Sequence, residues 1–549
     1  MRQLTRRLPD ILYIWFVASL ILPNVILSYT EPLTLWGRIA NVALPLGVLG
    51  VVATASPKVG RTVWLLFPLV IIAAFQIVLL GMYGGSVIAV DMFLNVVTTN
   101  PGEAGELLSS LWPSVLLVCL LYLPSLVMAV YIMRRGMRLT PKFAGFNRRL
   151  SLGLGTVGLV AMMVSYAVSP TYAARRDIYP FNAGYNIYLA VDRTVRTGRY
   201  HYTSRGYSYG ARSTRPDSLR EVCVIVIGET SRASEWQLLG YRRSTNPRLI
   251  RRMSSGLYVA PRALSESNTT HKSVPMLLSP VESTSFDTDI YTTKSLITAF
   301  REAGWATAFV SNQRPNHSFI DFFGDEADET LFVSNQEGYV KEPGDFNLVA
   351  ELERILAKGA VKQLIVLHSY GSHFDYRDRY VREDARYQPD DYPEAAARHR
   401  DALVNAYDNT IVATDRFLDS VIQILENQGC QASLLYASDH GEDIFDHGSG
   451  RFLHASPTPT IEQVHVPLIV WLSDGYRRNN PAIDRNLRAN IRRDVSTSRS
   501  FCPTALALGG ISTSKSDGKA SLASSDYSPR PSLYLNDHNQ AVSLKSILR

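Results

Sequence analysis

The sequence predicts a two-part protein, in which a bundle of five membrane-spanning helices precedes an α/β domain. Three observations support this division of the 549-residue chain. The first third contains five long apolar runs, the later part alternates strand-like and helical patterns, and polar residues follow several of the strand-like runs. We therefore expect a membrane domain over 1–169, a linker over 170–218 and an α/β domain over 219–549.

The five apolar runs cover residues 11–27, 39–55, 63–82, 112–133 and 150–168. Each approaches the roughly 20 residues that are needed to cross a bilayer, and none carries a charged residue before its ends. A soluble helical bundle would need five uncharged stretches of this length, although core helices are normally shorter. We therefore predict five transmembrane helices.

Basic residues predict the orientation of these helices. They are concentrated before the first run, between the second and third, and between the fourth and fifth: Arg2, Arg6, Arg7, Lys58, Arg61, Arg134, Arg135, Arg138, Lys142, Arg148 and Arg149. The positive-inside rule makes these three segments cytoplasmic. With five crossings, everything after about Ser169 lies outside, which is the periplasm if the cell is Gram-negative. The first run is not expected to be a cleaved signal, because four more crossings follow it.

Two polar segments adjoin the membrane runs. Residues 86–111 are too polar for lipid but periodically apolar, which predicts an amphipathic helix at the outer interface. Residues 170–218 are rich in Tyr, Arg, Gly and Ser, which is typical of a bridge at the lipid headgroups.

The remaining chain alternates strand-like and helical patterns, as an α/β domain requires. Strands are predicted at 222–227, 307–311, 364–368, 434–438 and 466–472, and helices at 293–303, 347–358 and 396–426. After residue 510 the composition turns to Ser, Lys and Asp, and only 532–535 and 541–544 are expected to be ordered.

Charge and cysteine content exclude some functions. Many of the basic residues behind the net charge of +7 are topology determinants, and no nucleic-acid motif accompanies them, so no nucleic-acid partner is expected. Of the four cysteines, only Cys223, Cys430 and Cys502 lie in the outer part, where they allow at most one disulfide. The sequence does not decide whether Cys430 and Cys502 pair.

Candidate metal ligands follow two of the predicted strands. The first strand ends in Gly228-Glu229-Thr230, and the fourth runs into Asp439-His440. Open α/β folds bind their ligands at this carboxyl edge of the sheet. Two carboxylates and an imidazole suit zinc, which takes about four N, O or S ligands. Glu229 alone could equally be a helix N-terminal residue. The prediction of a zinc site therefore depends on Glu229, Asp439 and His440 together.

A threonine could complete this set. Thr270 lies in the segment 268–275, and a hydroxyl that binds a divalent metal ion becomes a nucleophile at neutral pH. Thr269 and Ser267 are nearby alternatives. The histidines His368, His373 and His454 also follow strands or lie in loops, where they could hold a second metal or bind a phosphate oxygen.

The motifs occur in a recognisable order: Gly228-Glu229-Thr230-Ser231-Arg232, Thr270 five residues before Pro275, Gly371-Ser372-His373, Ser438-Asp439-His440-Gly441-Glu442, and Leu453-His454. In this order they resemble the phosphoethanolamine transferases of the Gram-negative inner membrane, in the alkaline phosphatase and sulfatase superfamily. The resemblance covers nearly the whole chain. It implies that residues 219–549 form a sulfatase or alkaline-phosphatase-like α/β catalytic domain in the periplasm.

The resemblance also implies roles for single residues. Glu229, Asp439 and His440 match the ligands of one tight zinc site, which Thr270 joins as the residue that takes up phosphoethanolamine. His373 and His454 match the histidines that bind the transferred phosphate or a second zinc. Substrate-binding positions are matched more loosely by Asn95, Thr98 and Glu103 in the amphipathic segment, and by Asn312 and Gln313. Tyr407 and Asp408 match a motif with a structural role.

One departure leaves the acceptor open. In the lipid A enzymes two disulfide-bonded cysteines bracket the threonine, whereas Glu266 and Met276 occupy these positions here. The chain is therefore more similar to the cysteine-poor branch, whose members act on lipopolysaccharide core sugars or glycans, or have no assigned acceptor.

The implied activity is metal-dependent transfer of phosphoethanolamine from phosphatidylethanolamine to lipopolysaccharide core, lipid A or a glycan, through a phosphothreonine. Phosphoglycerol transfer from phosphatidylglycerol is the main alternative. A sulfatase activity is disfavoured because the Cys or Ser before x-Pro-x-Arg is missing around Thr270. A non-catalytic membrane sensor is disfavoured because a degenerate relative would be expected to lose metal ligands.

Overall fold

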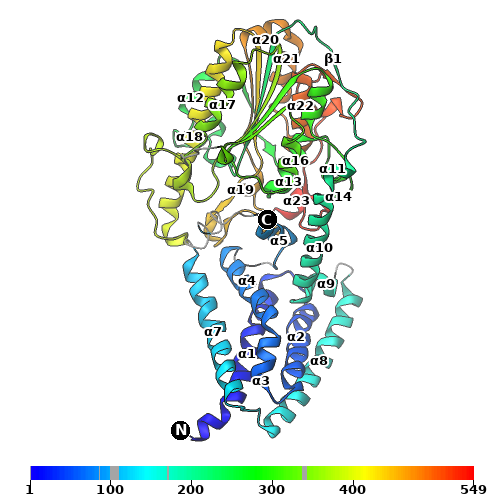
Figure 1. Cartoon of the computed structure of the whole chain (residues 1–549), viewed down its shortest axis with the longest axis vertical. Helices are drawn as coiled ribbons and strands as arrows, with labels where there is room; N and C mark the ends of the chain where they lie inside the picture. Colours follow the sequence, from blue (N-terminus) through cyan, green and yellow to red (C-terminus); the bar gives the residue numbers. More distant parts are fainter. Residues whose placement is uncertain are drawn as a thin grey trace. The chain divides into compact units, whose positions relative to one another are not determined.

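The structure of the protein is a computed structural model that describes residues 2–83, 85, 87–98, 105, 111–169, 172–336 and 343–548 (Figure 1). The chain forms two compact units. The N-terminal unit comprises Met1–Leu94, Leu108–Asp192 and His447–Arg451, and the C-terminal unit comprises Asn95–Leu107, Arg193–Asp446 and Phe452–Arg549. Each unit is described by itself below.

The N-terminal unit is helical. Four of its helices are long and apolar enough to cross a membrane, and a fifth candidate span is a pair of helices, α3 and α4, bent by 61°. The helices are α1 (Arg2–Thr30), α2 (Leu35–Ala55), α3 (Val59–Leu65), α4 (Phe67–Tyr83), α5 (Val90–Thr98), α7 (Trp112–Arg134), α8 (Pro141–Val168), α9 (Ala174–Asp177) and α10 (Phe181–Gly198). Helices α5 and α10 each continue into the C-terminal unit.

The third predicted span differs from an unbroken helix. The apolar run 63–82 is divided at Leu66, between α3 and α4. Pro68 lies in the first turn of α4 and has no N–H to continue the hydrogen-bond ladder from α3, which explains the bend. The fifth predicted span is longer than its apolar run, because α8 already begins at Pro141 and includes the basic residues before Leu150.

Helices α2 and α8 contact each other through glycines. A Cβ at Gly47 would collide with the backbone of Gly155, and a Cβ at Gly158 would collide with the backbone of Leu44. In a membrane the hydrophobic effect does not drive helices together, and small residues allow close van der Waals contact instead. The apolar runs predict that these helices exist, and the glycines determine how closely they pack.

Replacing Gly158 by Ala is expected to destabilise the α2–α8 contact. Overpacking of a close interface costs about 1–3 kcal/mol, so the thermal unfolding temperature of the detergent-solubilised protein should fall. Gly153→Ala on the same helix is the matched control, because a Cβ there meets nothing within 4 Å. Equal unfolding temperatures of the two variants would contradict the proposed role of the Gly158 contact.

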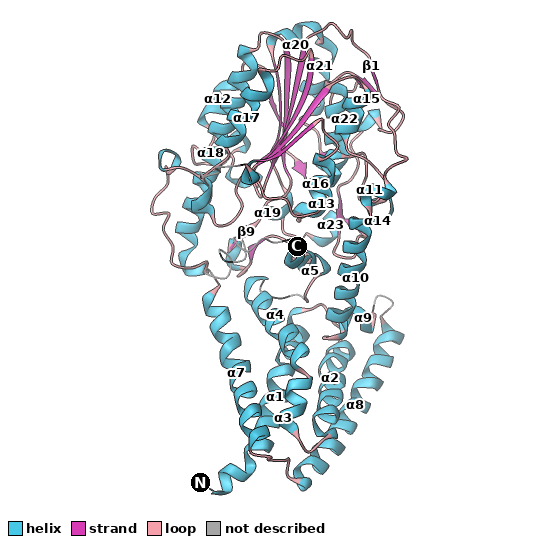
Figure 2. Cartoon of the chain, viewed as in Figure 1, coloured by secondary structure: helices cyan, strands magenta, loops and turns pink. Residues whose placement is uncertain are grey.

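The C-terminal unit is built on a seven-stranded sheet with the order β3-β11-β8-β2-β7-β5-β6 (Figure 2). Strands β8, β2, β7, β5 and β6 run parallel, whereas β11 is antiparallel to both β8 and β3. The strands are β2 (Glu221–Gly228), β3 (Leu257–Val259), β5 (Ala306–Ser311), β6 (Glu329–Phe332), β7 (Lys362–His368), β8 (Gln431–Ser438) and β11 (Leu468–Leu472). Strand β2 is at the centre and is buried along its whole length.

Helices cover both faces of this sheet (Figure 1). On one face lie α13 (Thr270–Leu278), α15 (Leu296–Glu302), α16 (Phe319–Gly324) and α22 (Thr497–Leu508), and on the other α12 (Pro247–Arg252), α17 (Phe346–Leu356) and α18 (Arg400–Asn427). Because both faces are covered, the central strands have continuous apolar sequences.

Smaller elements surround the sheet. Four two-stranded pairs are β1 (Arg212–Ser213) with β13 (Ile511–Ser512), β4 (Ala263–Leu264) with β12 (Val495–Ser496), β9 (Asp443–Ile444) with β10 (Phe452–Leu453), and β14 (Leu533–Leu535) with β15 (Ala541–Ser543). Short helices are α11 (Tyr200–Thr203), α14 (Phe286–Asp289), α19 (Ile461–Val464), α20 (Asp474–Asn479), α21 (Pro481–Asn490) and α23 (Leu544–Ile547).

All five predicted strands are present in the sheet, and both segments expected to be ordered after residue 510 form strands, β14 and β15. The expectation that only these two segments are ordered was wrong, because β13 and a 3-10 helix at Gly518–Ala520 precede them and Leu522 and Tyr527 are buried. Strands β3 and β6 were not predicted, because they are short strands at the two edges and β6 is only half-buried. The four cysteines are all free, so Cys430 and Cys502 do not form a disulfide.

Candidate metal centre

The candidate site lies where strands β2 and β8 end. The two strands are hydrogen-bonded neighbours, and Gly228 at the end of β2 pairs with Ser438 at the end of β8. Glu229 and Asp439 therefore leave the sheet at the same level, and His440 follows directly. Their ligand atoms all lie within 4.8 Å of one another.

The side chains of His440 and Asp439 are oriented by hydrogen bonds to their other atoms. His440 Nδ1 lies 2.9 Å from the carbonyl oxygen of Gly441, which leaves Nε2 directed at the two acids. Asp439 Oδ1 accepts the N–H groups of Thr230, at 3.1 Å, and His440, at 2.7 Å. Asp439 Oδ2 remains 3.3 Å from His440 Nε2. Each residue thus directs one atom at a common centre.

The charges at this centre fit a divalent cation. Burial, together with the charge of Asp439, raises the pKa of Glu229 to about 8, and burial raises the pKa of Asp439 to about 7. Both carboxylates lie close to His440 Nε2, with Glu229 Oε1 at 3.5 Å and Asp439 Oδ2 at 3.3 Å. Burial lowers the pKa of His440 to about 3, so this imidazole is neutral. A metal ion would supply the missing positive charge.

Thr270 places a hydroxyl between two of these ligands, Glu229 and His440. It is the first residue of α13, and its Oγ lies 3.0 Å from His440 Nε2 and 3.2 Å from Glu229 Oε1. The neighbouring Thr269 instead has its Oγ 3.1 Å from Ser267 Oγ. Among the three hydroxyls that the sequence left open, Thr270 has the geometry of a ligand and nucleophile.

His454 and His373 lie beside the three ligands. The ring of His454 is 4.2 Å from that of His440 and 6.2 Å from that of His373, between centroids. Burial lowers the pKa of His454 to about 4, so it is neutral and available to bind an anion or a metal. His368 is directed elsewhere, because it is buried with Nδ1 3.0 Å from Ser311 Oγ.

The candidate substrate residues have different positions. Gln313 Nε2 donates to Glu229 Oε2 at 3.1 Å and so belongs to the centre. Asn312 instead donates to the carbonyl of Gly344 at 2.9 Å and to the carboxylate of Asp345 at 2.8 Å. Glu103 lies outside the described residues, and Asn95 and Thr98 are described only as members of helix α5.

A strained backbone supports the first ligand. Thr230 has a φ of 58°, which is unusual for a residue with a branched side chain. Its hydroxyl donates to Glu229 Oε1 at 2.7 Å, and its carbonyl accepts from the Tyr407 hydroxyl at 2.7 Å. Tyr407 therefore has the structural role that the resemblance implied. The positive φ of Thr230 was not predicted, because no residue pattern in the sequence indicates it.

Arg232 was not predicted as part of the site. Its fully buried guanidinium donates to Glu235 at 2.6 Å, to Asp446 at 2.6 Å and to the carbonyl of Glu442 at 3.1 Å. These bonds join the loop after Glu229 to the segment between Asp439 and His454. The position of Arg232, three residues after Glu229, could have indicated that it belongs to the site. An Arg in a loop is normally exposed, however, so it was not expected to be buried there.

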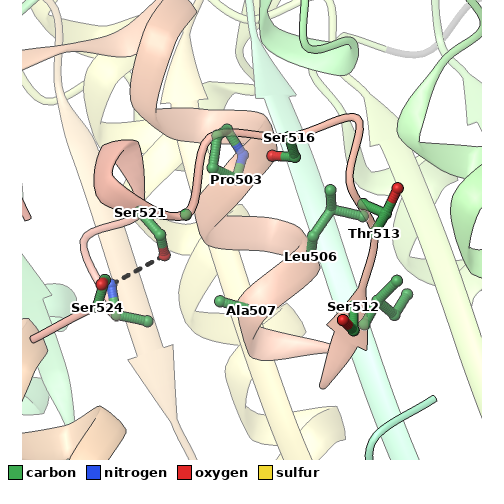
Figure 3. A pocket seen from close by; sticks show the side chains of 11 residues that line it. Pro503, Leu506, Ala507, Ser512, Thr513, Ser516, Ser521 and Ser524 are labelled. Atoms are coloured by element: carbon green, nitrogen blue, oxygen red, sulfur yellow. Dashed lines mark hydrogen bonds between the residues drawn. The ribbon is translucent and has the colours of Figure 1, made fainter. Parts of the chain in front are cut away.

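A separate cavity of about 340 Å³ lies beside helix α22 (Figure 3). None of its lining residues is titratable: Pro503, Leu506, Ala507, Ile511, Ser512, Thr513, Ser516, Gly518, Ser521, Ala523 and Ser524. This cavity therefore lacks the acid–base and metal-binding groups that are present at Glu229, Asp439 and His440.

Comparison with protein families matches residues 221–511, just over half of the chain, to the sulfatase family. The chain is 29% identical over 266 residues to the Kdo(2)-lipid A phosphoethanolamine 7''-transferase of Escherichia coli, covering 47% of this chain and 45% of the relative. It is 28% identical over 305 residues to the Escherichia coli phosphoethanolamine transferase EptA, covering 54% of each. The chain thus spans about half the length of the curated relatives it matches.

Solved structures share the fold. The integral membrane lipooligosaccharide phosphoethanolamine transferase A from Neisseria meningitidis matches 93% of this chain and 98% of its own, with a TM-score of 0.72 and 22% identity. The zinc complex of the C-terminal periplasmic domain of EcEptC from Escherichia coli matches 61% of this chain and 96% of its own, with a TM-score of 0.55 and 22% identity. The predicted fold class, apolar N-terminal helices before an α/β sulfatase-type domain, is confirmed.

Gly371→Ala is expected to weaken metal binding. Gly371 has a φ of 53°, and a Cβ there would lie 2.5 Å from the carbonyl oxygen of Glu229. Calorimetric titration of the metal-depleted protein should show lower zinc affinity. Gly429→Ala is the matched control, since Gly429 has a φ of 62° but a Cβ would meet nothing within 4 Å. Equal affinities in both variants would show that Gly371 does not position Glu229.

Zinc affinity is also expected to rise with pH between 6 and 8. The pKa values of about 8 for Glu229 and about 7 for Asp439 exceed those of ordinary carboxyl groups, so both carry protons at pH 6 that zinc must displace. With these pKa values, competition by protons should make the dissociation constant roughly 500-fold larger at pH 6 than at pH 8. Glu229→Gln should make this dependence shallower by about one proton, and equal wild-type affinity at both pH values would refute the explanation.

Proposed function

The chain belongs to the sulfatase family, and we propose that it transfers phosphoethanolamine from phosphatidylethanolamine to an acceptor of the cell envelope. The phosphoethanolamine transferases among its relatives support this reaction class. The observation that carries the proposal is the position of Thr270, whose Oγ lies 3.2 Å from Glu229 Oε1 and 3.0 Å from His440 Nε2. A hydroxyl in contact with a metal-binding group is the arrangement that covalent phosphoryl transfer requires.

Zinc is the proposed cofactor. Glu229, Asp439 and His440 would hold it in one tight site together with the Thr270 oxygen, and the zinc complex of the EcEptC domain supports this choice of metal. When bound, zinc would lower the pKa of the hydroxyl and neutralise charge on the phosphoryl group. His373 and His454 would bind either the transferred phosphoryl oxygens or a second zinc.

The proposed reaction has two displacement steps at phosphorus. In the first, Thr270 Oγ forms a bond to the phosphorus of the donor, the bond to the diacylglycerol oxygen breaks, and overall one proton passes from Thr270 to diacylglycerol. In the second, an oxygen of the acceptor hydroxyl or phosphate forms the new bond to phosphorus, the bond to Thr270 Oγ breaks, and overall one proton passes from the acceptor to Thr270. The N-terminus of α13, where Thr270 stands, favours the negative charge that develops there.

The membrane helices suit a lipid donor. With the basic segments in the cytoplasm, the C-terminal unit would lie in the periplasm beside the outer leaflet of the inner membrane. The linker over 170–218 would lie at the membrane surface, because α10 exposes the apolar residues Phe181, Tyr188 and Val191. The donor lipid would then reach Thr270 without entering bulk water.

The acceptor is proposed at the level of a class. Relatives named for Kdo(2)-lipid A support lipopolysaccharide, either its core or lipid A, and a glycan is the other candidate. Nothing in the described contacts of Glu266 and Met276, which replace the cysteines of the lipid A enzymes, selects among these acceptors.

Incubation of the purified protein with phosphatidylethanolamine is expected to add phosphoethanolamine to Thr270. Intact mass and peptide mapping should locate the adduct, and Thr270→Ala should abolish it because the variant lacks the hydroxyl that lies 3.0 Å from His440 Nε2. Thr269→Ala is the matched control, since the Thr269 hydroxyl contacts Ser267 instead. This variant should retain adduct formation.

The donor is tested in parallel with phosphatidylglycerol. A phosphoglycerol adduct on Thr270, without a phosphoethanolamine adduct, would replace the proposed donor. An adduct that persists in Thr270→Ala would move the nucleophile to another residue. If the zinc-loaded protein forms no adduct with either lipid, the transferase proposal is wrong.

A further inference from the structure

The C-terminal hairpin is ordered against the rest of the C-terminal unit although the preceding chain is rich in Ser, Lys and Asp. It consists of β14 and β15, joined by the turn 536–540. The Asn536 side chain closes this turn by accepting the N–H groups of His538, at 3.0 Å, and Gln540, at 2.9 Å. Tyr534 on β14 is buried among Val464 and Leu544, so the hairpin has a defined position.

Four hydrogen bonds join this hairpin to residues just before and just after Thr270. They involve positions 266, 268 and 272 on one side and the backbone or side chains of β14 and its turn on the other. The bonds are Leu535 N–H to Glu266 O (2.7 Å), Leu533 N–H to Glu266 Oε1 (3.4 Å), Tyr534 hydroxyl to Asn268 Oδ1 (2.6 Å) and Lys272 ammonium to Asn536 O (2.9 Å). Thr270 therefore lies in a segment that the hairpin holds on both sides.

Asn268 extends this connection to His454. Its backbone carbonyl accepts the N–H of Ala455 at 3.2 Å, and its side-chain amide donates to the carbonyl of Ser456 at 2.9 Å. Ala455 follows His454 directly and has a left-handed φ of 65°, so this turn needs external support. Because Tyr534 donates to the amide oxygen of Asn268, it fixes the side chain that joins the Thr270 loop to the His454 turn.

We propose that Tyr534 is a positioning residue that holds Thr270 and His454 in register through Asn268. The proposal rests on the proposed function for its catalytic consequence, but its structural consequence can be measured independently. The alternative is that the Tyr534 hydroxyl stabilises the fold in the way that any buried, hydrogen-bonded hydroxyl does. The two explanations predict different effects of removing the hydroxyl. The positioning role predicts changes at Thr270 and His454, whereas a general stabilising role does not single out these residues.

Tyr527 provides a matched control for this difference. Like Tyr534 it is a buried tyrosine of the C-terminal segment, and its hydroxyl donates one hydrogen bond, to the carbonyl of Asp494 at 2.9 Å. This bond does not involve the segment that carries Thr270. Tyr534→Phe and Tyr527→Phe each remove a single oxygen atom and keep the ring, so both variants are expected to fold.

Hydrogen exchange of the full, zinc-loaded chain tests the structural part. In Tyr534→Phe the amides of residues 266–272 and of Ala455 should exchange about 10-fold faster than in the wild type, because local opening becomes easier. In Tyr527→Phe these amides should exchange at the wild-type rate. Unchanged exchange in Tyr534→Phe, or equal changes in both variants, would overturn the proposal.

Adduct formation from phosphatidylethanolamine tests the catalytic part. Tyr534→Phe should slow the formation of the Thr270 adduct about 10-fold or more, since small misplacements of reacting groups have large effects on rate. Zinc affinity should stay at the wild-type value, because the Tyr534 hydroxyl donates to Asn268, which is not one of the three ligands. Asn268→Ala should slow the reaction similarly, and combining it with Tyr534→Phe should add little, because the two residues act as one unit.

The outcomes separate this proposal from the proposed function. If the wild type forms no adduct with phosphatidylethanolamine or phosphatidylglycerol, the proposed function is wrong. The positioning role of Tyr534 is then tested by hydrogen exchange alone. If the wild type reacts and Tyr534→Phe reacts no more slowly than Tyr527→Phe, the positioning role is refuted.

Discussion

The site depends on two carboxylates that are buried side by side. Strands β2 and β8 are in register, so Glu229 and Asp439 emerge at one level of the sheet and their charges repel each other. Burying an uncompensated charge costs several kcal/mol, and the neutral His440 does not offset it. Protonation or a divalent cation removes this repulsion. Without a cation, the two carboxylates therefore lower the stability of the fold. With a divalent metal ion between them, their charges are compensated.

The loops around these ligands adopt strained conformations that distant residues support. Thr230, Leu453 and Ala455 all have positive φ values, which cost about 1–3 kcal/mol each. The hydroxyl of Tyr407 on α18 holds the carbonyl of Thr230, and the carbonyl of Asn268 accepts from Ala455. Each strained turn thus carries or adjoins a site residue and is held by a different part of the chain. The ligand geometry is consequently a property of the whole C-terminal unit.

The sequence predicted those features that depend on local patterns. Continuous apolar runs predicted the central strands. Glu229, Asp439 and His440 were proposed as ligands because they follow such runs directly, and the structure brings these three side chains together. The direction of a side chain could not be predicted from the sequence. For example, Gln313 contacts Glu229, whereas the adjacent Asn312 contacts Asp345. Pro68 could have predicted the bend between α3 and α4. It was not used, because the prediction of this span relied on the continuous hydropathy of the run 63–82.

Hydrogen bonds, not a disulfide, hold the segment that carries Thr270. All four cysteines are free, and Glu266 lies shortly before Thr270 in this segment. Its carboxylate accepts the hydroxyl of Ser496 at 2.8 Å and the N–H of Leu533, so one side chain connects three separate segments. A covalent bond constrains two points, whereas this set of hydrogen bonds requires the last strands of the chain to be folded in place. Thr270 therefore acquires its final position only when residues distant in sequence have assembled around it.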